Sequence, residues 1–217
     1  DTVPASSTYY NSSYFDEIYH ARTAYEHLRG VYPYEVSHPP LGKVILSLGI
    51  ALFGMTPFGW RCMGALFGLA MLPLMWDLLR RMFRDDRVAL CGAALLAFDF
   101  MHLTQTRIAT IDSFATLFIL LMYLFLYRYF AEGKLRHLAA CGIAFGVGAA
   151  TKWTCLYAGA GLGVLWALHW VLSGVQAHRD GGGRRYARRL LGNIGFCLVF
   201  FVLVPGMIYY ASYYPYG

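Results

Sequence analysis

Residues 111–130 have the sequence IDSFATLFILLMYLFLYRYF, with no charged residue between Asp112 and Arg128. A helix of about 17 to 25 mainly apolar residues crosses the hydrocarbon core of a bilayer. This stretch therefore predicts a transmembrane helix. Five further stretches have the same character, at 60–80, 87–106, 136–151, 153–173 and 190–212.

The composition supports a membrane protein. Of the 217 residues, 58% are hydrophobic and only 14% are charged, whereas about 25% of the residues of a typical soluble domain are charged. The polar surface is too small to cover a water-soluble globule, so we predict an all-α, polytopic transmembrane helical bundle. The net charge of +6 is better explained by membrane orientation than by nucleic-acid binding, which we do not expect.

The basic residues are distributed unevenly between the loops. Twelve of the 18 lie in or beside three alternate loops: Arg80, Arg81, Arg84, Arg87, Arg128, Lys134, Arg136, Arg179, Arg184, Arg185, Arg188 and Arg189. The positive-inside rule places these loops in the cytoplasm. We therefore predict an extracytoplasmic loop at 1–59, a six-helix transmembrane region at 60–212, and the start of another extracytoplasmic loop at 213–217.

The first loop is predicted to contain two juxtamembrane helices, at 16–29 and 41–55. Ser13 is positioned to cap the first helix, which is amphipathic. The apolar part of the second, Leu41 to Phe53, is short for a membrane span, so we expect a helix lying at the outer surface. If it crossed instead, the first 40 residues would be cytoplasmic.

The first helix begins with two adjacent acids, Asp16 and Glu17, and His20 follows one turn later. Acids in a first helical turn often only complement the helix dipole. The alternative is a general base at the membrane surface, which would take the proton of a substrate hydroxyl.

Other charged residues are expected at the same side of the membrane. His38 precedes Pro39-Pro40, which stiffen the chain, and Lys43 lies in the first turn of the next helix. Lys43 is suited either to reach the headgroups or to hold a lipid phosphate. Arg107, Asp112 and Lys152 lie at the outer ends of predicted spans. Ionisable groups at this depth are costly, so their convergence favours a site over an ion-pair network.

Cysteine and histidine patterns give no clear metal or disulfide prediction. The five cysteines are widely spaced within apolar stretches and are expected to be small buried side chains. Glu17, His20 and His38 could assemble a metal site, but their spacing is not a recognised ligand pattern. No cofactor is firmly implied, and dependence on a divalent metal stays open.

Five segments, in order, carry a family resemblance: FDEIYH at 15–20, SHPPLGK at 37–43, PFGWR at 57–61, TQTRIATID at 104–112 and TKWT at 151–154. Together they resemble the protein O-mannosyltransferases, and their bacterial members most closely. These are glycosyltransferases of the GT-C fold that use polyprenyl-phosphate sugars. The family has a transmembrane helix before the first of these segments and further parts after the last span, so the resemblance implies that this sequence is a fragment.

The resemblance also implies roles for individual residues. It makes Asp16 the catalytic residue and Glu17 its supporting neighbour. It suggests that donor phosphate and sugar are bound by His38, Lys43, Arg61, Arg107 and Asp112, and we add Lys152 from its position.

The implied activity is an inverting transfer of mannose from a polyprenyl-phosphate-mannose donor to Ser or Thr hydroxyls of exported proteins. The expected setting is a bacterial plasma membrane rather than the endoplasmic reticulum, with an extracytoplasmic active site and membrane lipid as a further partner. An alternative within the fold is another sugar, such as a pentose, or a lipid or cell-wall glycan acceptor. A transporter or a structural membrane subunit is the alternative of another class; the chain has no convincing internal repeat to support transport.

Overall fold

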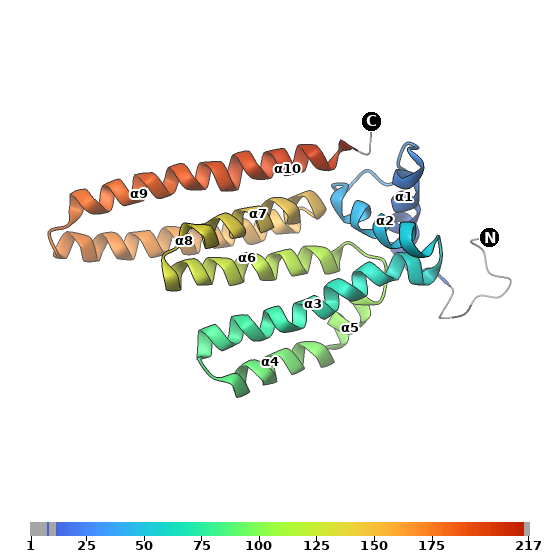
Figure 1. Cartoon of the computed structure of the whole chain (residues 1–217), viewed down its shortest axis with the longest axis horizontal. Coiled ribbons are helices and arrows are strands. Elements are labelled where there is room, and N and C mark those ends of the chain that lie inside the picture. The colour runs from blue at the N-terminus through green and yellow to red at the C-terminus, as the bar shows by residue number, and fades with distance from the viewer. Residues whose placement is uncertain (1–7, 9–11, 215–217) are drawn as a thin grey trace.

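The apolar stretches fold into long helices that lie side by side in the computed structural model, which describes residue 8 and residues 12–214 (Figure 1). The regular elements of this part of the chain are all helical. They are α1 (Glu17–Arg29), α2 (Leu41–Phe53), α3 (Pro57–Phe83), α4 (Asp86–Phe98), α5 (Phe100–Thr106), α6 (Asp112–Glu132), α7 (Leu135–Thr151), α8 (Thr154–Arg179), α9 (Gly183–Leu198), the π-helical segment Val199–Leu203, and α10 (Val204–Ser212). Residues 1–7 and 9–11 of the predicted first loop, and 215–217, lie outside the described residues.

Four uninterrupted helical segments are long and apolar enough to cross a membrane: Pro57–Phe83, Asp112–Glu132, Thr154–Arg179 and Gly183–Ser212. A fifth span results if α4 and α5 are counted together, and α7 has only 17 residues. The all-α, polytopic architecture expected from the hydropathy is confirmed, and the chain is an integral membrane protein.

One predicted span is not a continuous helix. The expected helix at 87–106 is broken at Asp99, and the axis of its second part is bent by 58° from that of the first. Asp99 has an extended backbone and its carboxylate accepts a hydrogen bond from the backbone N–H of His102 at 2.6 Å. A polar cap of this kind starts a new helix, so α5 turns away from the direction of α4.

The cap predicted for the first helix is wrong. The helix begins at Glu17, and its N-cap position is occupied by Asp16 and not by Ser13. The backbone N–H of Glu17 donates to the carbonyl of Tyr14 at 3.1 Å, closing a turn that separates Ser13 from the helix. The second helix ends at Phe53, two residues earlier than predicted, because Gly54 takes a positive φ of 77°.

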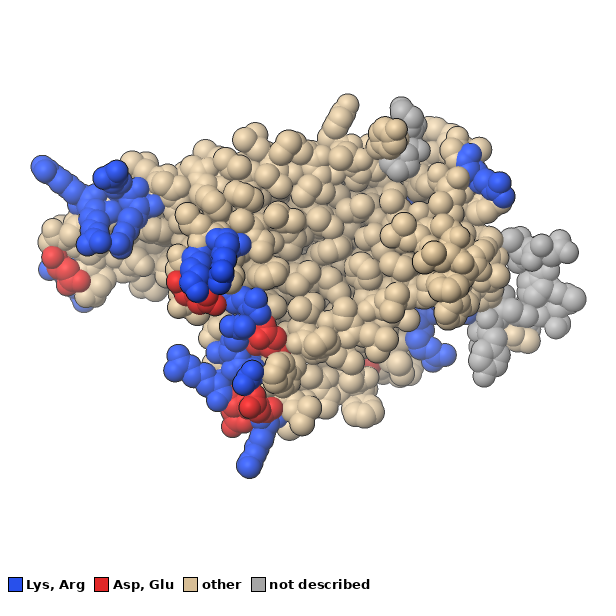
Figure 2. Space-filling model, in the orientation of Figure 1, with Lys and Arg blue, Asp and Glu red and all other residues tan. Residues whose placement is uncertain are grey.

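The helices α1 and α2 lie across one end of the bundle (Figure 1). A buried cluster joins them to α3, α6 and the segment between α5 and α6; it contains Ala21, Ala24, Leu46, Ile50, Trp60, Ala109, Ile111 and Phe114. The opposite end carries the basic loops, and Figure 2 shows Lys and Arg gathered there. The molecule therefore has one basic end and one end built from α1, α2 and the helix termini around them.

Candidate active site

Glu17 is completely buried and its carboxylate is held from three directions. Arg61 on α3 donates to it twice, from Nε to Oε1 at 2.8 Å and from Nη2 to Oε2 at 2.7 Å. The backbone N–H of Ala109 donates to Oε1 at 3.0 Å, and that of Tyr14 to Oε2 at 3.1 Å. These contacts fix the start of α1 against α3 and the segment after α5.

Asp16 is placed very differently from its neighbour. Its carboxylate is partly exposed and makes no hydrogen bond or ion pair with any residue that the structure describes. The residue before it, Phe15, has a left-handed backbone with φ of 49°. A non-glycine residue in that region is strained by about 1 to 3 kcal/mol, and such strain persists only where surrounding contacts impose it. The bonds of Glu17 impose it here and leave Asp16 presented at the helix N-terminus.

A second buried group is built around Lys43, which is fully enclosed in the first turn of α2. Its ammonium donates to a carboxylate oxygen of Glu35 at 2.5 Å, to the carbonyl of Glu35 at 3.0 Å and to that of His38 at 2.9 Å. All three N–H donors are thus used within the protein. Lys43 organises the approach to α2, and it has no donor left for a phosphate in this arrangement.

The carboxylate of Glu35 is the centre of this group. Ser37 and the backbone N–H of His38 donate to it, and the ring Nδ1 of His38 lies 3.2 Å from Oε1. Burial by itself would raise the pKa of Glu35, but the hydrogen bonds, those from Lys43 and Ser37 above all, outweigh it and lower that pKa to about 2. Glu35 is therefore ionised at physiological pH.

His20 joins this group to Asp16. Its Nδ1 lies 3.8 Å from Oε2 of Glu35, and its ring meets that of His38 edge to face. Burial lowers the pKa of His20 to about 4, although the charges of Glu35 and Asp16 act in the opposite direction. His20 is neutral at physiological pH, so it adds no positive charge beside Glu35 and Asp16.

The remaining predicted residues lie at the same end of the bundle. Nζ of Lys152 lies 2.6 Å from Oδ1 of Asp112, in a pair that joins the start of α6 to the end of α7. A Cβ placed on Gly42 would lie 2.7 Å from Ile111 Cγ2 and 3.1 Å from Thr151 Cγ2. The residue before Lys43 therefore packs directly against the residues that precede Asp112 and Lys152.

Two features complete the geometry. Arg107 is exposed at the end of α5 and pairs with no carboxylate among the described residues. A pocket of about 200 Å³ lies beside Asp112, and Asp99, His102 and Gln105 also line it. Asp16 is not among its lining residues.

The predicted residues thus fall into three groups, according to their burial and their contacts. Glu17, Arg61 and Lys43 are engaged in buried contacts, Asp112 and Lys152 form a partly exposed pair, and Asp16 and Arg107 stand free of described partners. Glu35 was not predicted, although a buried lysine requires a carboxylate and Glu35 is the nearest one upstream. Within residues 8 and 12–214, no three His, Cys, Asp or Glu side chains are arranged to hold a metal ion.

The comparison with known families gives this arrangement a context. The family model described as "Dolichyl-phosphate-mannose-protein mannosyltransferase" matches residues 37–176, well over half of the chain. The chain belongs to this family. The match includes His38, Lys43, Arg61, Arg107, Asp112 and Lys152, and it begins after Asp16, Glu17 and Glu35.

Three relatives show how far the similarity extends. The "Polyprenol-phosphate-mannose--protein mannosyltransferase" of Mycolicibacterium smegmatis is 28% identical over 203 residues, covering 83% of this chain and 39% of the relative. Proteins of the same name in Mycobacterium tuberculosis and Corynebacterium glutamicum are 38% and 36% identical over 84 residues, which are 39% of this chain and 16% of each relative. The chain thus spans about two fifths of the length of the first of these relatives.

Proposed function

We propose that this chain supplies the catalytic base and the donor-binding end of a polyprenyl-phosphate-mannose-dependent protein mannosyltransferase. The proposal is supported by the family membership, by the names of the relatives and by the contrast between two adjacent acids. Glu17 is locked by Arg61 and Ala109, whereas Asp16 is presented without a described partner. That contrast carries the proposal, because a general base must be held in place and yet keep its own lone pairs for the substrate.

The reaction follows from this arrangement. Asp16 accepts the proton of a Ser or Thr hydroxyl as the hydroxyl oxygen attacks the anomeric carbon of mannose. The bond from that carbon to the phosphate oxygen breaks as the new bond forms on the opposite face, which inverts the configuration. The electron pair leaves with the polyprenyl phosphate.

The leaving phosphate requires a cation. Lys43 and Arg61 are held in buried pairs with carboxylates. Arg107 and Lys152, whose pair with Asp112 is partly exposed, are left for this task. Preorganised charge of this kind is often the largest single contribution to catalysis. In this proposal Lys43, Arg61 and Glu17 are positioning residues, His38 helps to shape the approach to α2, and Asp112 holds Lys152 until the phosphate binds.

The charge distribution sets the orientation. The basic end faces the cytoplasm by the positive-inside rule, so the end with α1 and α2 faces the extracytoplasmic side. Residues 1–59 are then an extracytoplasmic loop with two juxtamembrane helices. Because the relatives are bacterial, the membrane is a plasma membrane and the acceptors are exported proteins.

The test uses the full-length protein in membranes with labelled polyprenyl-phosphate-mannose and a panel of protein, lipid and glycan acceptors. Asp16→Asn is expected to lower turnover by about 10² to 10⁴-fold, the usual contribution of a general base, while donor binding is kept. Asp86→Asn, an exposed acid at the opposite end of the bundle, is the matched control. Near-normal turnover by Asp16→Asn would refute the assignment of the base, and label confined to lipid or glycan would refute that of the acceptor.

A further inference from the structure

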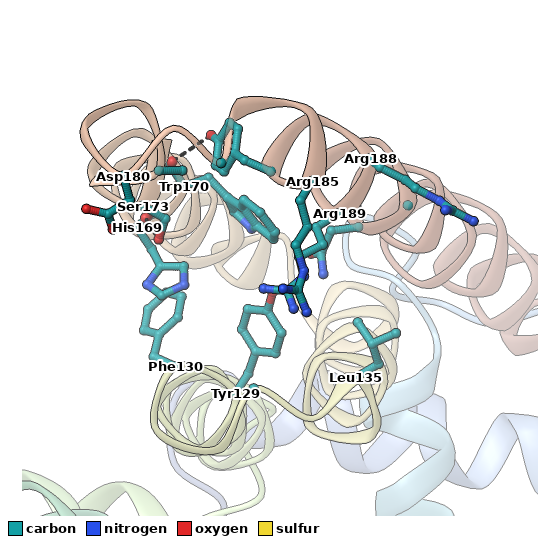
Figure 3. A pocket seen from close by; sticks show the side chains of 16 residues that line it. Tyr129, Phe130, Leu135, His169, Trp170, Ser173, Asp180, Arg185, Arg188 and Arg189 are labelled. Carbon is teal, nitrogen blue, oxygen red and sulfur yellow. Dashed lines mark hydrogen bonds between the residues drawn. The ribbon is translucent and has the colours of Figure 1, made fainter. Parts of the chain in front are cut away.

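A large pocket lies at the basic end of the bundle, far from the candidate active site. Its volume is about 840 Å³, and it is formed by the end of α6, the start of α7, α8 and the first turns of α9 (Figure 3). Aromatic side chains, among them Tyr129, Phe130 and Trp170, form part of its wall. Three arginines, Arg185, Arg188 and Arg189, line it from α9.

The charges in this pocket favour an anion. Figure 3 shows Arg185 and Arg189 pointing toward Tyr129, and neither pairs with a carboxylate among the described residues. Asp180 is the one carboxylate among the lining residues, and its oxygens accept hydrogen bonds from Gln176 at 3.2 and 3.3 Å. The lining therefore has a surplus of two positive charges, with guanidinium groups that suit the oxygens of a phosphate.

The walls of the pocket are fixed by specific contacts. The hydroxyl of Tyr186 donates to the carbonyl of Trp170 at 2.7 Å, which holds α9 against α8. The rings of Phe130 and His169 stack with centroids 4.6 Å apart, which holds α6 against α8. The arginines are thus presented from a braced helix, and the pocket has a defined shape.

A second cavity lies one helical turn further into the bundle on the same helices. It has a volume of about 330 Å³, and its lining includes Leu126, Leu138, Leu162, Trp166, Cys197 and Phe201. Leu126 is one turn before Phe130, Trp166 one turn before Trp170, and Cys197 one turn after Asn193, which lines the larger pocket. Trp166 donates to Asn193 at 3.2 Å where the two sets of residues meet. A basic pocket is therefore followed by an apolar cavity in the direction of the bilayer.

We propose that these two cavities form a binding site for an anionic glycerophospholipid of the leaflet at the basic end. The phosphate lies between Arg185 and Arg189, and part of an acyl chain enters the apolar cavity. A soluble anion would use the arginines alone, and a zwitterionic lipid would bring a cation of its own to an already basic pocket. An anionic lipid matches both the charge and the apolar continuation. The site is separate from the proposed transfer chemistry and does not depend on it.

The experiment measures lipid retention by the full-length protein purified in non-ionic detergent. Labelled phosphatidylglycerol and phosphatidylcholine are offered in mixed micelles, and bound label is counted after separation. We expect selective retention of phosphatidylglycerol. The double variant Arg185→Gln with Arg189→Gln is expected to bind this lipid at least about tenfold more weakly. The matched control is Arg179→Gln with Arg184→Gln, which removes two charges from the same region but from residues that do not line the pocket.

A second pair of variants tests the apolar cavity. Gly163 lines it and has open space for a side chain, so Gly163→Leu is expected to fill the cavity and weaken retention while the arginines stay in place. Gly161 on the same helix is equally open and does not line the cavity, which makes Gly161→Leu its control. Excess inorganic phosphate tests whether the pocket binds a free phosphate or the phosphate of a lipid headgroup. It is expected to compete poorly with the labelled lipid.

Four results would overturn the proposal. One is equal loss of binding in both arginine pairs, which would indicate diffuse attraction. Another is wild-type retention by Gly163→Leu. The third is equal retention of the two lipids, and the fourth is full displacement by inorganic phosphate. Thermal unfolding of each variant identifies any that fails to fold. If the double variant fails, retention of phosphatidylglycerol is measured on a folded Arg185→Gln single variant, and wild-type retention there would overturn the proposal.

Discussion

Arg61 and Glu17 form a two-pronged ion pair between residues 44 positions apart in the sequence, with bonds of 2.8 and 2.7 Å. The carboxylate is completely buried and the guanidinium is mostly buried. A bidentate pair of this kind fixes orientation as well as distance. Its effect is to hold the first turn of α1, and with it Asp16, at a set position on the bundle.

Removal of Arg61 is therefore expected to be strongly destabilising. Arg61→Met leaves the Glu17 carboxylate buried without its main partner, which typically costs about 3 to 5 kcal/mol. Thermal unfolding in detergent measures the loss. The control is Arg80→Met, which breaks an exposed pair with Asp86, and exposed pairs contribute about 1 kcal/mol or less. Equal unfolding temperatures for the two variants would contradict the structural role of Arg61.

The pair of Lys43 and Glu35 leads to a double-mutant prediction. Lys43→Met and Glu35→Gln are each expected to destabilise the protein by about 3 to 5 kcal/mol, since each leaves a buried charge without its partner. The double variant is expected to lose less than the sum, with a coupling of about 1 to 3 kcal/mol. Unfolding of the four proteins under one condition gives the coupling directly. Strict additivity would show that the two groups do not depend on each other.

Acid is expected to destabilise the α1–α2 end in two steps. Burial lowers the pKa of His20 from 6.5 to about 4, so the unfolded chain binds a proton between these values and the folded chain does not. Stability therefore falls as the pH falls from 6.5 to 4. The pKa of Glu35 is lowered from 4.5 to about 2, so its contribution is complete above pH 4.5 and is lost below it. The charged groups that act on His20 are Glu35, Lys43 and Asp16, with His38 as a further neighbour.

Unfolding temperatures measured from pH 8 to pH 2 check this prediction. His20→Gln is expected to flatten the change between pH 6.5 and 4 and to leave the loss below pH 4.5. His178→Gln, at an exposed position at the other end of the bundle, is expected to leave the whole profile unchanged. A wild-type profile for His20→Gln would contradict a buried neutral histidine.

The positions of the helices could be predicted from the sequence because long apolar stretches in a membrane protein have few alternatives to helix. The predicted span at 111–130 differs from α6 by two residues or fewer at each end. The break at Asp99 was missed because one acid in an apolar stretch is equally compatible with a continuous helix. Its cap on His102 depends on a local turn that hydropathy does not detect.

The sequence could predict which of these residues lie at the same end of the bundle, but not how they pair with one another. Sequence order indicated that Asp16, Lys43 and Arg107 belong at one end of the bundle, and they lie there. The partner of Lys43 could not be inferred, because it depends on the path of the segment that brings Glu35 back over α2. The enclosure of Glu17 depends on Ala109, which is 92 positions away in the sequence.

Close packing at Gly42 gives the last prediction. Replacing a helical glycine by alanine usually favours the helix by about 1 kcal/mol, and Gly192→Ala in α9, where nothing lies within 4 Å of an added Cβ, is expected to show that gain. At Gly42 the new Cβ would lie 2.7 Å from Ile111, a completely buried and β-branched side chain that has no room to move. Gly42→Ala is therefore expected to destabilise the protein by about 1 to 3 kcal/mol and to shift Lys43 relative to Asp112 and Lys152. Changes of opposite sign in the free energy of unfolding of the two variants would support this contact. A higher free energy of unfolding in both would show that α2 is free to move away from Ile111.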